Sequence, residues 1–354
     1  RSPAVDEVVE TLIEHSHGEL HLVVSGRFRP TFRVSALLAR GLVTLLDAGD
    51  LALSLEQASE VVGAGVSAAD LALLHARTEG WAVALQLARL WLDRGRHRPD
   101  ALKDFSGRTT EMTDYLAEQI VADLPEELRE FLLETAILER FDASLADAVR
   151  NRSDSQDLLE RLRHFDALLV PLDDAREWFR YHHLFADFLC QRLKRGSASI
   201  TAVLHGRAAR ALAAVGDLPE AVQHAIEADD TALAVALTQQ AGGWELILWK
   251  GIGYVRSVLK CFNELTIRSE SVLQLTQAYL DIKLGRFEAA RELLTLSGTM
   301  LDAADPRTRR DFTIVQSLWN VYVDDLAGNG FSALIEAHSN GLESSDHLGR
   351  GTLV

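Results

Sequence analysis

Hydrophobic positions recur at helical spacing through most of the chain, and only a few short segments break that rule. Residues 5–15 carry apolar side chains three and four positions apart, which predicts a helix with one apolar face. Two short apolar runs follow, at residues 21–24 and 43–46, and both predict buried strands. A helix followed by buried strands is typical of the end of a doubly wound α/β domain. Residues 1–54 are therefore predicted to be the C-terminal part of such a domain, with the rest of its sheet upstream.

The pattern turns wholly helical after this first region. Ser54 and Ser67 each precede an apolar run with the spacing of a capping box, so both predict helix starts. Gly80 interrupts the periodicity, which resumes at the next residue. The charged stretch 93–100 (DRGRHRPD) is the clearest linker in the chain. These signals predict a helical domain over residues 55–100.

Short helices and one hairpin make up the next region. The periodicity predicts four helices, at residues 110–121, 125–137, 142–150 and 155–165. Two apolar runs, 167–172 and 178–181, flank a turn at Asp173-Asp174 and predict a β-hairpin. A further helix is predicted from His182 to residue 194. Helices, then a two-stranded wing, then a helix describe a winged-helix domain, here over residues 101–195.

The remaining residues, 196–354, predict paired helices. Two stretches resemble each other, each with a glycine between two helical segments, at Gly216 and Gly285. These glycines stand 69 positions apart (285 minus 216), close to two periods of the roughly 34-residue tetratricopeptide repeat. We therefore expect a tetratricopeptide-like helical superhelix in this part of the chain.

Composition agrees with a mainly helical protein. The 354 residues allow two or three domains, and 47% of them are hydrophobic. The net charge of −16 argues against a nucleic-acid-binding surface here, because phosphate contacts need clustered Lys and Arg. Cys190 and Cys261 have the spacing of neither a metal site nor a disulfide framework, which favours a reducing cytoplasm, and no run is long enough for a membrane helix. The sequence opens on Arg1 rather than Met, so we expect an internal segment of a longer protein.

Motifs for catalysis are absent from the sequence. It contains no Gly-x-x-x-x-Gly-Lys-Ser/Thr loop and no apolar strand that ends in magnesium-binding aspartates. Ser25 lacks the preceding glycine of a nucleophile elbow. We therefore assign no catalytic residue and no metal ligand, and we expect the chain alone to hydrolyse nothing.

Three short segments, in a fixed order, resemble one known family. They are residues 22–30 (LVVSGRFRP), 78–88 (TEGWAVALQLA) and 178–189 (WFRYHHLFADFL). Together they resemble the maltose-activator-like branch of the STAND ATPases, which are large LuxR-type transcription regulators with a nucleotide switch. The resemblance implies the end of a P-loop NTPase domain, a helical domain, a winged helix and the start of a sensor superhelix.

The first segment implies a phosphate contact for Arg27. In the family, the arginine that follows this strand senses the terminal phosphate of the nucleotide. A guanidinium at the C-terminal end of a strand lies where α/β sheets bind ligands, and it forms bidentate bonds to phosphate. Gly26 stands where the family has serine, which leaves Arg29 as an alternative. A solvated surface arginine is the simpler interpretation of either residue.

The second segment implies an adenine contact for Gly80 and Trp81. Backbone N–H groups at a helix start and a flat indole suit the edge and the face of a purine. The alternative is that Trp81 only packs the core of the helical domain.

The third segment implies that His182 binds the β-phosphate of ADP. His182 resembles the histidine of the Met-His-Asp motif in related animal and plant STAND proteins, although His183 stands where those proteins have aspartate. An imidazole donor there would add to the positive end of the helix that begins at this point. A metal site at the two histidines is the alternative, but side chains that are adjacent at a helix start diverge, and no third ligand is evident. The resemblance thus implies that the winged helix locks an ADP-bound resting form.

For the full-length protein, the resemblance implies ATP or ADP with magnesium, an inducer on the helical repeats, and self-association on activation. The inducer would be a small molecule or a protein, and DNA would be bound through a C-terminal helix-turn-helix outside this sequence. The winged helix itself is expected to be a lock rather than a DNA reader, because residues 155–164 mix acids with arginines. Two alternatives stay open: a repeat-type interaction scaffold with a vestigial nucleotide domain, and the regulatory module of a protein kinase.

Overall fold

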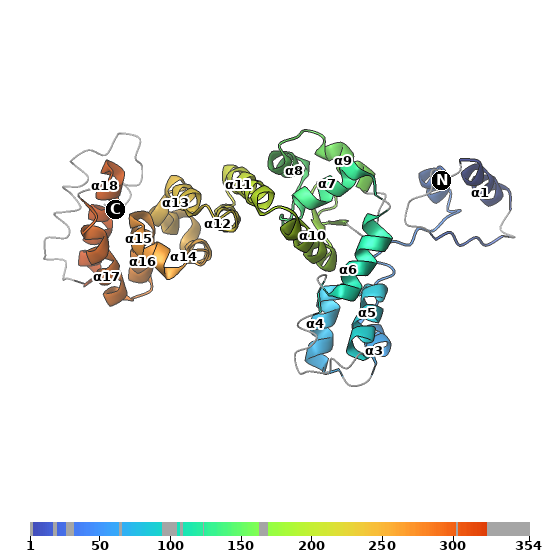
Figure 1. Ribbon diagram of the computed structural model, residues 1–354, viewed down its shortest axis with the longest axis horizontal. Coiled ribbons are helices and arrows are strands. Elements are labelled where there is room, and N and C mark those ends of the chain that lie inside the picture. Colours follow the sequence, from blue (N-terminus) through green and yellow to red (C-terminus); the bar gives the residue numbers. More distant parts are fainter. Residues whose placement is uncertain are drawn as a thin grey trace. The chain divides into compact units, whose positions relative to one another are not determined.

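The computed structural model describes most of the chain and shows a mainly helical protein with one small sheet. The residues described are 3–16, 20–25, 32–63, 66–93, 105–106, 109–122, 124–162, 169–301 and 304–323. The chain divides into two compact units, residues 1–201 and 202–354, and Figure 1 shows the helices of both. No helix within these described ranges is both long enough and apolar enough to cross a membrane.

The first helix of unit 1 confirms the prediction for residues 5–15. It is α1 (Pro3–His15), and a second short helix, α2 (Val34–Ala39), follows it. Two ion pairs join these helices, from Arg33 to Glu10 and from Arg40 to Glu14.

The two strands predicted for this region are wrong. Residues 21–24 and 43–46 belong to no sheet, and their side chains are not buried: Val23 is 94% exposed and Leu46 is 65% exposed. An extended segment becomes a strand only when a neighbour satisfies its N–H and C=O groups. None of the described residues pairs with either run.

Three helices form the predicted helical domain. They are α3 (Leu55–Val62), α4 (Ala68–Thr78) and α5 (Ala82–Asp93), which pack against one another (Figure 1). The capping box at Ser54 is complete, because its hydroxyl accepts from Gln57 N–H while the Gln57 side chain accepts from Ser54 N–H. At Ser67 the hydroxyl caps Asp70 N–H. The linker predicted at 93–100 lies outside the described residues from residue 94 onward.

Helices and a hairpin lie where they were predicted within residues 101–195. The helices are α6 (Thr110–Leu116), the π-helical turn Ala117–Val121, α7 (Glu126–Thr135), α8 (Ala143–Arg150), α9 (Ser155–Leu162) and α10 (His183–Gly196). The hairpin consists of β1 (Leu169–Pro171) and β2 (Phe179–Tyr181), which pair antiparallel with Val170 opposite Arg180. Phe141 bridges the other edge of β2 through two 2.8 Å bonds with Phe179 and acts as a one-residue third strand. The sequence analysis did not predict this third strand.

Aromatic rings and one buried arginine hold the winged-helix domain together. Phe131, Phe141, Tyr181 and Phe185 form a chain of ring contacts with centroids 5.1–6.3 Å apart. The side chain of Arg150 is fully buried over the Phe131 ring, and it pairs with the carboxylates of Glu134 on α7 and of Asp154, which directly precedes α9. This charge is tolerated in the core because its partners accept its hydrogen bonds.

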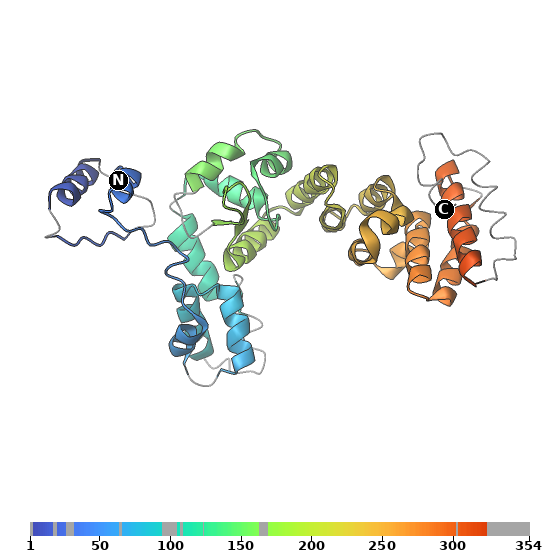
Figure 2. The same cartoon turned by 180° about the vertical axis from the view of Figure 1, so that it is seen from behind.

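Unit 2 consists of helical hairpins. Its helices are α11 (Ala198–Ala214, which begins at the end of unit 1), α12 (Leu218–Glu227), α13 (Thr231–Gln240), the 3₁₀ turn Gly243–Glu245, α14 (Leu246–Leu259), α15 (Glu264–Ser269), α16 (Ser271–Lys283), α17 (Phe287–Gly298) and α18 (Pro306–Val323). Figure 2 shows them from behind, with α16 beside α17 and α18.

The two glycines that suggested a repeat occupy the same kind of turn. Gly216 and Gly285 follow α11 and α16 with φ of 85° and 73°. In both turns the N–H of the next residue reaches back five positions, from Asp217 to Leu212 C=O and from Arg286 to Asp281 C=O. This is the Schellman helix ending, so the two hairpins are closed by one device.

A pair of histidines is buried between α11 and α12. The Nδ1 atoms of His205 and His224 lie 2.7 Å apart, and both side chains are buried. Burial, reinforced by the neighbouring His205, lowers the pKa of His224 to about 4. His224 is therefore neutral at physiological pH.

Candidate functional site

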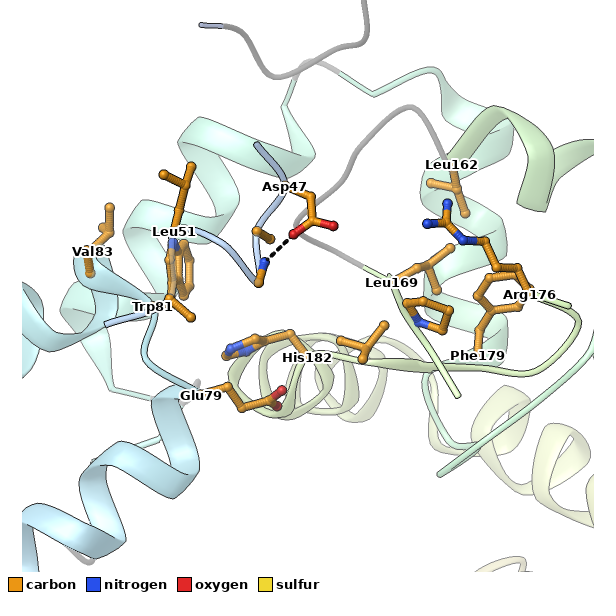
Figure 3. Close-up of a pocket in the computed structure, with 16 residues that line it drawn as sticks. Asp47, Leu51, Glu79, Trp81, Val83, Leu162, Leu169, Arg176, Phe179 and His182 are labelled. Atoms are coloured by element: carbon orange, nitrogen blue, oxygen red, sulfur yellow. Dashed lines mark hydrogen bonds between the residues drawn. The ribbon is translucent and has the colours of Figure 1, made fainter. Parts of the chain in front are cut away.

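A cavity of about 630 Å³ lies in unit 1, between the helical domain and the winged-helix domain. One wall is formed by the loop at residues 47–52 and the start of α5, and the other by α9, the hairpin and His182 (Figure 3). Much of the lining is apolar, and its apolar members include Leu51, Val83, Leu162, Leu169, Pro171 and Phe179. The volume lies within the range of pockets that bind small organic ligands.

Trp81 stands at the start of α5 and points its ring toward the winged helix. The indole is half-buried, and its centroid lies 5.9 Å from the Tyr115 ring and 5.6 Å from the His182 ring, edge-on in both cases. Its backbone N–H already donates to the Thr78 carbonyl at 2.8 Å. The side chain therefore lines the cavity, whereas this backbone N–H is already bonded.

Gly80 does not line the cavity but packs against Leu53, next to the loop that does. It has φ of 74°, and a Cβ atom added to it would stand 2.5 Å from the Leu53 carbonyl oxygen. The Gly80 carbonyl accepts from Leu53 N–H at 2.8 Å, and the His75 ring bonds the Leu53 carbonyl at the same distance. Only glycine combines this backbone conformation with so close an approach. Gly80 thus fixes the loop that carries one wall of the cavity.

His182 closes the site from the winged-helix side. Its Nε2 lies 3.0 Å from the Thr78 carbonyl oxygen, and since a carbonyl only accepts, Nε2 carries the proton. Its Nδ1 is buried and has no hydrogen-bond partner among the described residues. Burial lowers the pKa of His182 below its usual value, while the nearby Glu79 acts in the opposite direction. The resting ring is therefore neutral, with a bare acceptor at Nδ1.

A bidentate ion pair ties the two walls together below the cavity. Arg180 of β2 donates to both carboxylate oxygens of Glu79, at 2.9 and 2.8 Å, across 101 positions of sequence. Burial raises the pKa of Glu79, but the hydrogen bond and charge of Arg180 outweigh it and hold that pKa below its ordinary value. Glu79 has φ of 50° at the end of α4, a left-handed conformation that turns its side chain toward the hairpin.

The structure brings together two of the four residues chosen from the sequence. Trp81 and His182 line one cavity and contact each other, and Gly80 lies directly behind them. Arg27, with Gly26 and Arg29, lies outside the described residues. His183 is exposed, and its Nε2 lies 3.6 Å from Glu79. In the described part of the chain, no group of three or more His, Cys, Asp or Glu side chains is arranged to hold a metal ion.

Sequence reasoning missed three contributors to the site: Glu79, Arg180 and Arg176. The first two lie within the quoted motifs, as the Glu of TEGW and the Arg of WFRYHH, but nothing in the sequence shows that they pair. Arg176 lies in the turn of the hairpin with φ of 54°, and its side chain borders the cavity opposite Trp81 (Figure 3). The cavity thus combines the polar side chains of Asp47, Glu79, Arg176 and His182 with a largely apolar lining.

Comparison with known proteins finds one matching family model and several relatives. Residues 117–201 match the family model of the MalT winged helix domain. The serine/threonine-protein kinase PknK of Mycobacterium tuberculosis is 35% identical over 233 residues, which are 65% of this chain and 21% of the kinase. The HTH-type transcriptional regulator MalT of Vibrio cholerae is 26% identical over 308 residues, which are 84% of this chain and 34% of the regulator.

A solved structure adds a distant similarity. It is a STAND protein with a tetratricopeptide repeat sensor from Pyrococcus horikoshii, matched at a TM-score of 0.39 and 13% identity over 82% of this chain and 47% of that one. The chain spans about a fifth of the kinase and a third of the MalT relative. Residues 117–201 thus correspond to a MalT-type winged helix domain, and the wider sequence is similar to that of MalT.

Proposed function

We propose that this chain is the switch module of a nucleotide-dependent transcription regulator, and that the cavity receives part of an adenine nucleotide. The observation that supports this most is that Trp81 and His182 line the same cavity from different domains. A ligand between them would contact both the helical domain and the winged helix. Its presence would therefore bias how the two domains are held together, as a switch requires.

The available groups fit an adenine nucleotide. The indole of Trp81 and the apolar walls suit a flat base, and His182 and Arg176 supply polar groups at the cavity. In the longer protein, Arg27 would meet the terminal phosphate, and magnesium and a phosphate-binding loop would come from chain outside this sequence. Exposed apolar side chains in the first region, such as Val23 and Leu46, fit a sheet completed by that other chain.

The nucleotide bound in the cavity would set the regulatory state of the longer protein. ADP would hold the winged helix in the resting form, and an inducer on the helices of unit 2 would favour ATP. Self-association would then allow a C-terminal helix-turn-helix to bind DNA in the cytoplasm. The longer protein would be a weak switch ATPase, whereas residues 1–354 alone would bind nucleotide poorly and hydrolyse none.

Nucleotide content tests the proposal directly. The full-length protein, purified without added nucleotide, is expected to retain ADP, and His182→Ala is expected to lose it or to become active without inducer. His183→Ala is the matched control, because its side chain is exposed and does not line the cavity. If neither wild type nor control carries nucleotide, the interaction-scaffold alternative replaces the switch.

The kinase relative supports a second candidate. PknK, which is named as a serine/threonine-protein kinase, is 35% identical over 233 residues, or 65% of this chain. The same module would then regulate phosphorylation rather than transcription. The sequence that surrounds residues 1–354 in the full-length protein decides between them, since a kinase catalytic loop and a helix-turn-helix are readily distinguished.

A further inference from the structure

The two ring nitrogens of His182 face different surroundings. Nε2 donates to the Thr78 carbonyl at 3.0 Å, so its proton is committed to the protein. His182 lines the cavity, and in the neutral ring its buried Nδ1 is a lone-pair acceptor with no partner among the described residues. A phosphate oxygen also accepts and does not donate. The two cannot bond unless a proton lies between them.

Burial, more than the charged groups around it, lowers the pKa of His182 in the absence of ligand. Glu79 at the end of α4 is the nearest anion, but its carboxylate is engaged by both guanidinium nitrogens of Arg180 on β2. His183 on α10 and Arg180 both disfavour a second positive charge, and burial does so more strongly than either. Asp47 and Arg176 line the same cavity, and the Asp47 carboxylate accepts from Gly49 N–H of its own loop at 2.9 Å.

An anionic ligand changes this balance. A phosphate at Nδ1 supplies the negative charge that Glu79, paired with Arg180, supplies only in part. We propose, resting on the nucleotide function above, that ADP enters the cavity together with one proton, which binds His182 Nδ1 and converts it from an acceptor into a donor. In the complex, Nε2–H still donates to Thr78, and Nδ1–H donates to the phosphate as a charge-assisted bond.

The direction of the pH dependence follows from linkage. The free protein has a lowered His182 pKa, and the complex has a raised one, so binding takes up a proton between the two values. ADP affinity is therefore highest at low pH and falls as pH rises, by up to about tenfold per pH unit inside that window. Above the window the affinity is low and constant.

The experiment measures ADP binding by titration calorimetry in nucleotide-free full-length protein, from about pH 6 to about pH 8, where a histidine titrates. At a pH inside the window, the binding enthalpy is compared in two buffers of different ionisation enthalpy, which counts the protons taken up. Uptake of up to one proton, with affinity falling as pH rises, is the expected result.

Two variants isolate His182. His182→Asn places an amide where Nδ1 was and can donate without titrating, so it should bind ADP with no proton uptake of its own. His182→Gln places its amide where Nε2 was, keeps a donor for Thr78 and leaves nothing at Nδ1, so it should bind weakly at every pH. The terminal phosphate of ADP titrates near pH 6 in all three proteins, and the difference between wild type and His182→Asn removes that contribution. Thermal unfolding of each variant verifies that it is folded.

The outcomes separate this inference from the function on which it rests. If wild type binds ADP with the same pH profile as His182→Asn and takes up no proton, the proton linkage is wrong and the nucleotide switch stands. If folded wild type binds no ADP at any pH, both are wrong.

Discussion

Two regions of this chain carry short apolar runs of the kind that predicts strands, and only one of them forms a sheet. In the winged-helix domain, β1 and β2 pair with each other, Phe141 pairs with β2, and Phe179 is 3% exposed. In the first region, residues 21–24 and 43–46 pair with nothing described, and Val23 is 94% exposed. The difference teaches that composition selects a candidate strand, whereas a neighbouring strand decides whether it forms. The winged-helix domain contains its own partners.

The largest expected effect compares one apolar residue from each region. Phe141→Ala removes a fully buried ring that contacts Phe131 and Tyr181, and it should lower the free energy of unfolding by about 3–5 kcal/mol. Val23→Ala removes an exposed side chain and should change it by less than about 0.5 kcal/mol. Urea denaturation of residues 1–354 followed by circular dichroism measures both. Similar losses would break the comparison, since they would show that the first region is packed in solution.

Unit 2 should respond to acid, because it buries His224 beside His205, whereas the winged-helix domain buries the ion-paired Arg150. Because the pKa of His224 falls from 6.5 to about 4 on folding, the folded state binds fewer protons than the unfolded state. The stability of unit 2 should be full above pH 6.5 and should decline as pH falls toward 4, by about 3 kcal/mol in total. The measurement is the urea midpoint as a function of pH. His224→Asn keeps an amide beside His205 and should flatten the decline; an unchanged decline would assign it to other groups.

The next prediction concerns the buried Arg150 of the winged-helix domain, which depends on ion-pair partners within that domain. Arg150→Ala leaves Glu134 and Asp154 without their shared cation and empties a site over Phe131, so it should cost about 3 kcal/mol of unfolding free energy. Arg152→Ala is the matched control, because that arginine pairs with Glu130 at the surface, and its loss should stay below about 1 kcal/mol. Thermal or urea unfolding compares the two, and equal losses would mean that burial of Arg150 contributes nothing.

A smaller effect is expected at Gly80, where the first region meets the helical domain. Gly80→Ala combines positive φ with a Cβ only 2.5 Å from the Leu53 carbonyl oxygen, and should cost about 2 kcal/mol. Gly216→Ala has similar φ but nothing within 4 Å, so it should cost about 1 kcal/mol. Unfolding free energies of the two variants give the contribution of the close approach as their difference. No difference would show that the loop at residues 47–53 is not held against Gly80.

The smallest expected effect concerns the ion pair between the two walls. Glu79→Gln should cost less than about 1 kcal/mol near neutral pH, because both partners are about one-quarter exposed and solvent screens the pair. The pKa of Glu79 is lowered on folding, so its contribution is present above pH 4.5 and is lost as pH falls below that value. Glu79→Gln should therefore narrow its gap to wild type in acid, as measured by thermal unfolding at two pH values. A gap that widens in acid would contradict this sign.

Much of the local structure was predictable, because it depends on neighbours in sequence. The helices follow from periodicity, the starts at Ser54 and Ser67 from capping spacing, and the hairpin from two apolar runs around a turn. Phe141 was not predictable as a strand, because a single bridging residue has no period. The prediction of strands at residues 21–24 and 43–46 was wrong, because the hydrophobic pattern of a segment does not reveal whether a neighbouring strand is present to pair with it.

The site was predictable only in part. Trp81 and His182 were chosen through a resemblance, and their shared cavity needs the three-dimensional structure. Glu79 and Arg180 stand 101 positions apart, and only the fold makes them partners. The tautomer of His182 depends on the Thr78 carbonyl, an atom present in every residue, so no residue pattern marks it. Long-range contacts and backbone acceptors are the two things that the sequence did not reveal.

The Thr78 carbonyl oxygen accepts from two donors at once, Trp81 N–H and His182 Nε2–H. Trp81 caps α5, and His182 is the N-cap of α10, so the beginnings of two helices from different domains are joined at a single oxygen. This shared acceptor is a direct link between the two domains. A rotation of the winged helix about this oxygen retains both of these hydrogen bonds, whereas a translation away from it breaks at least one.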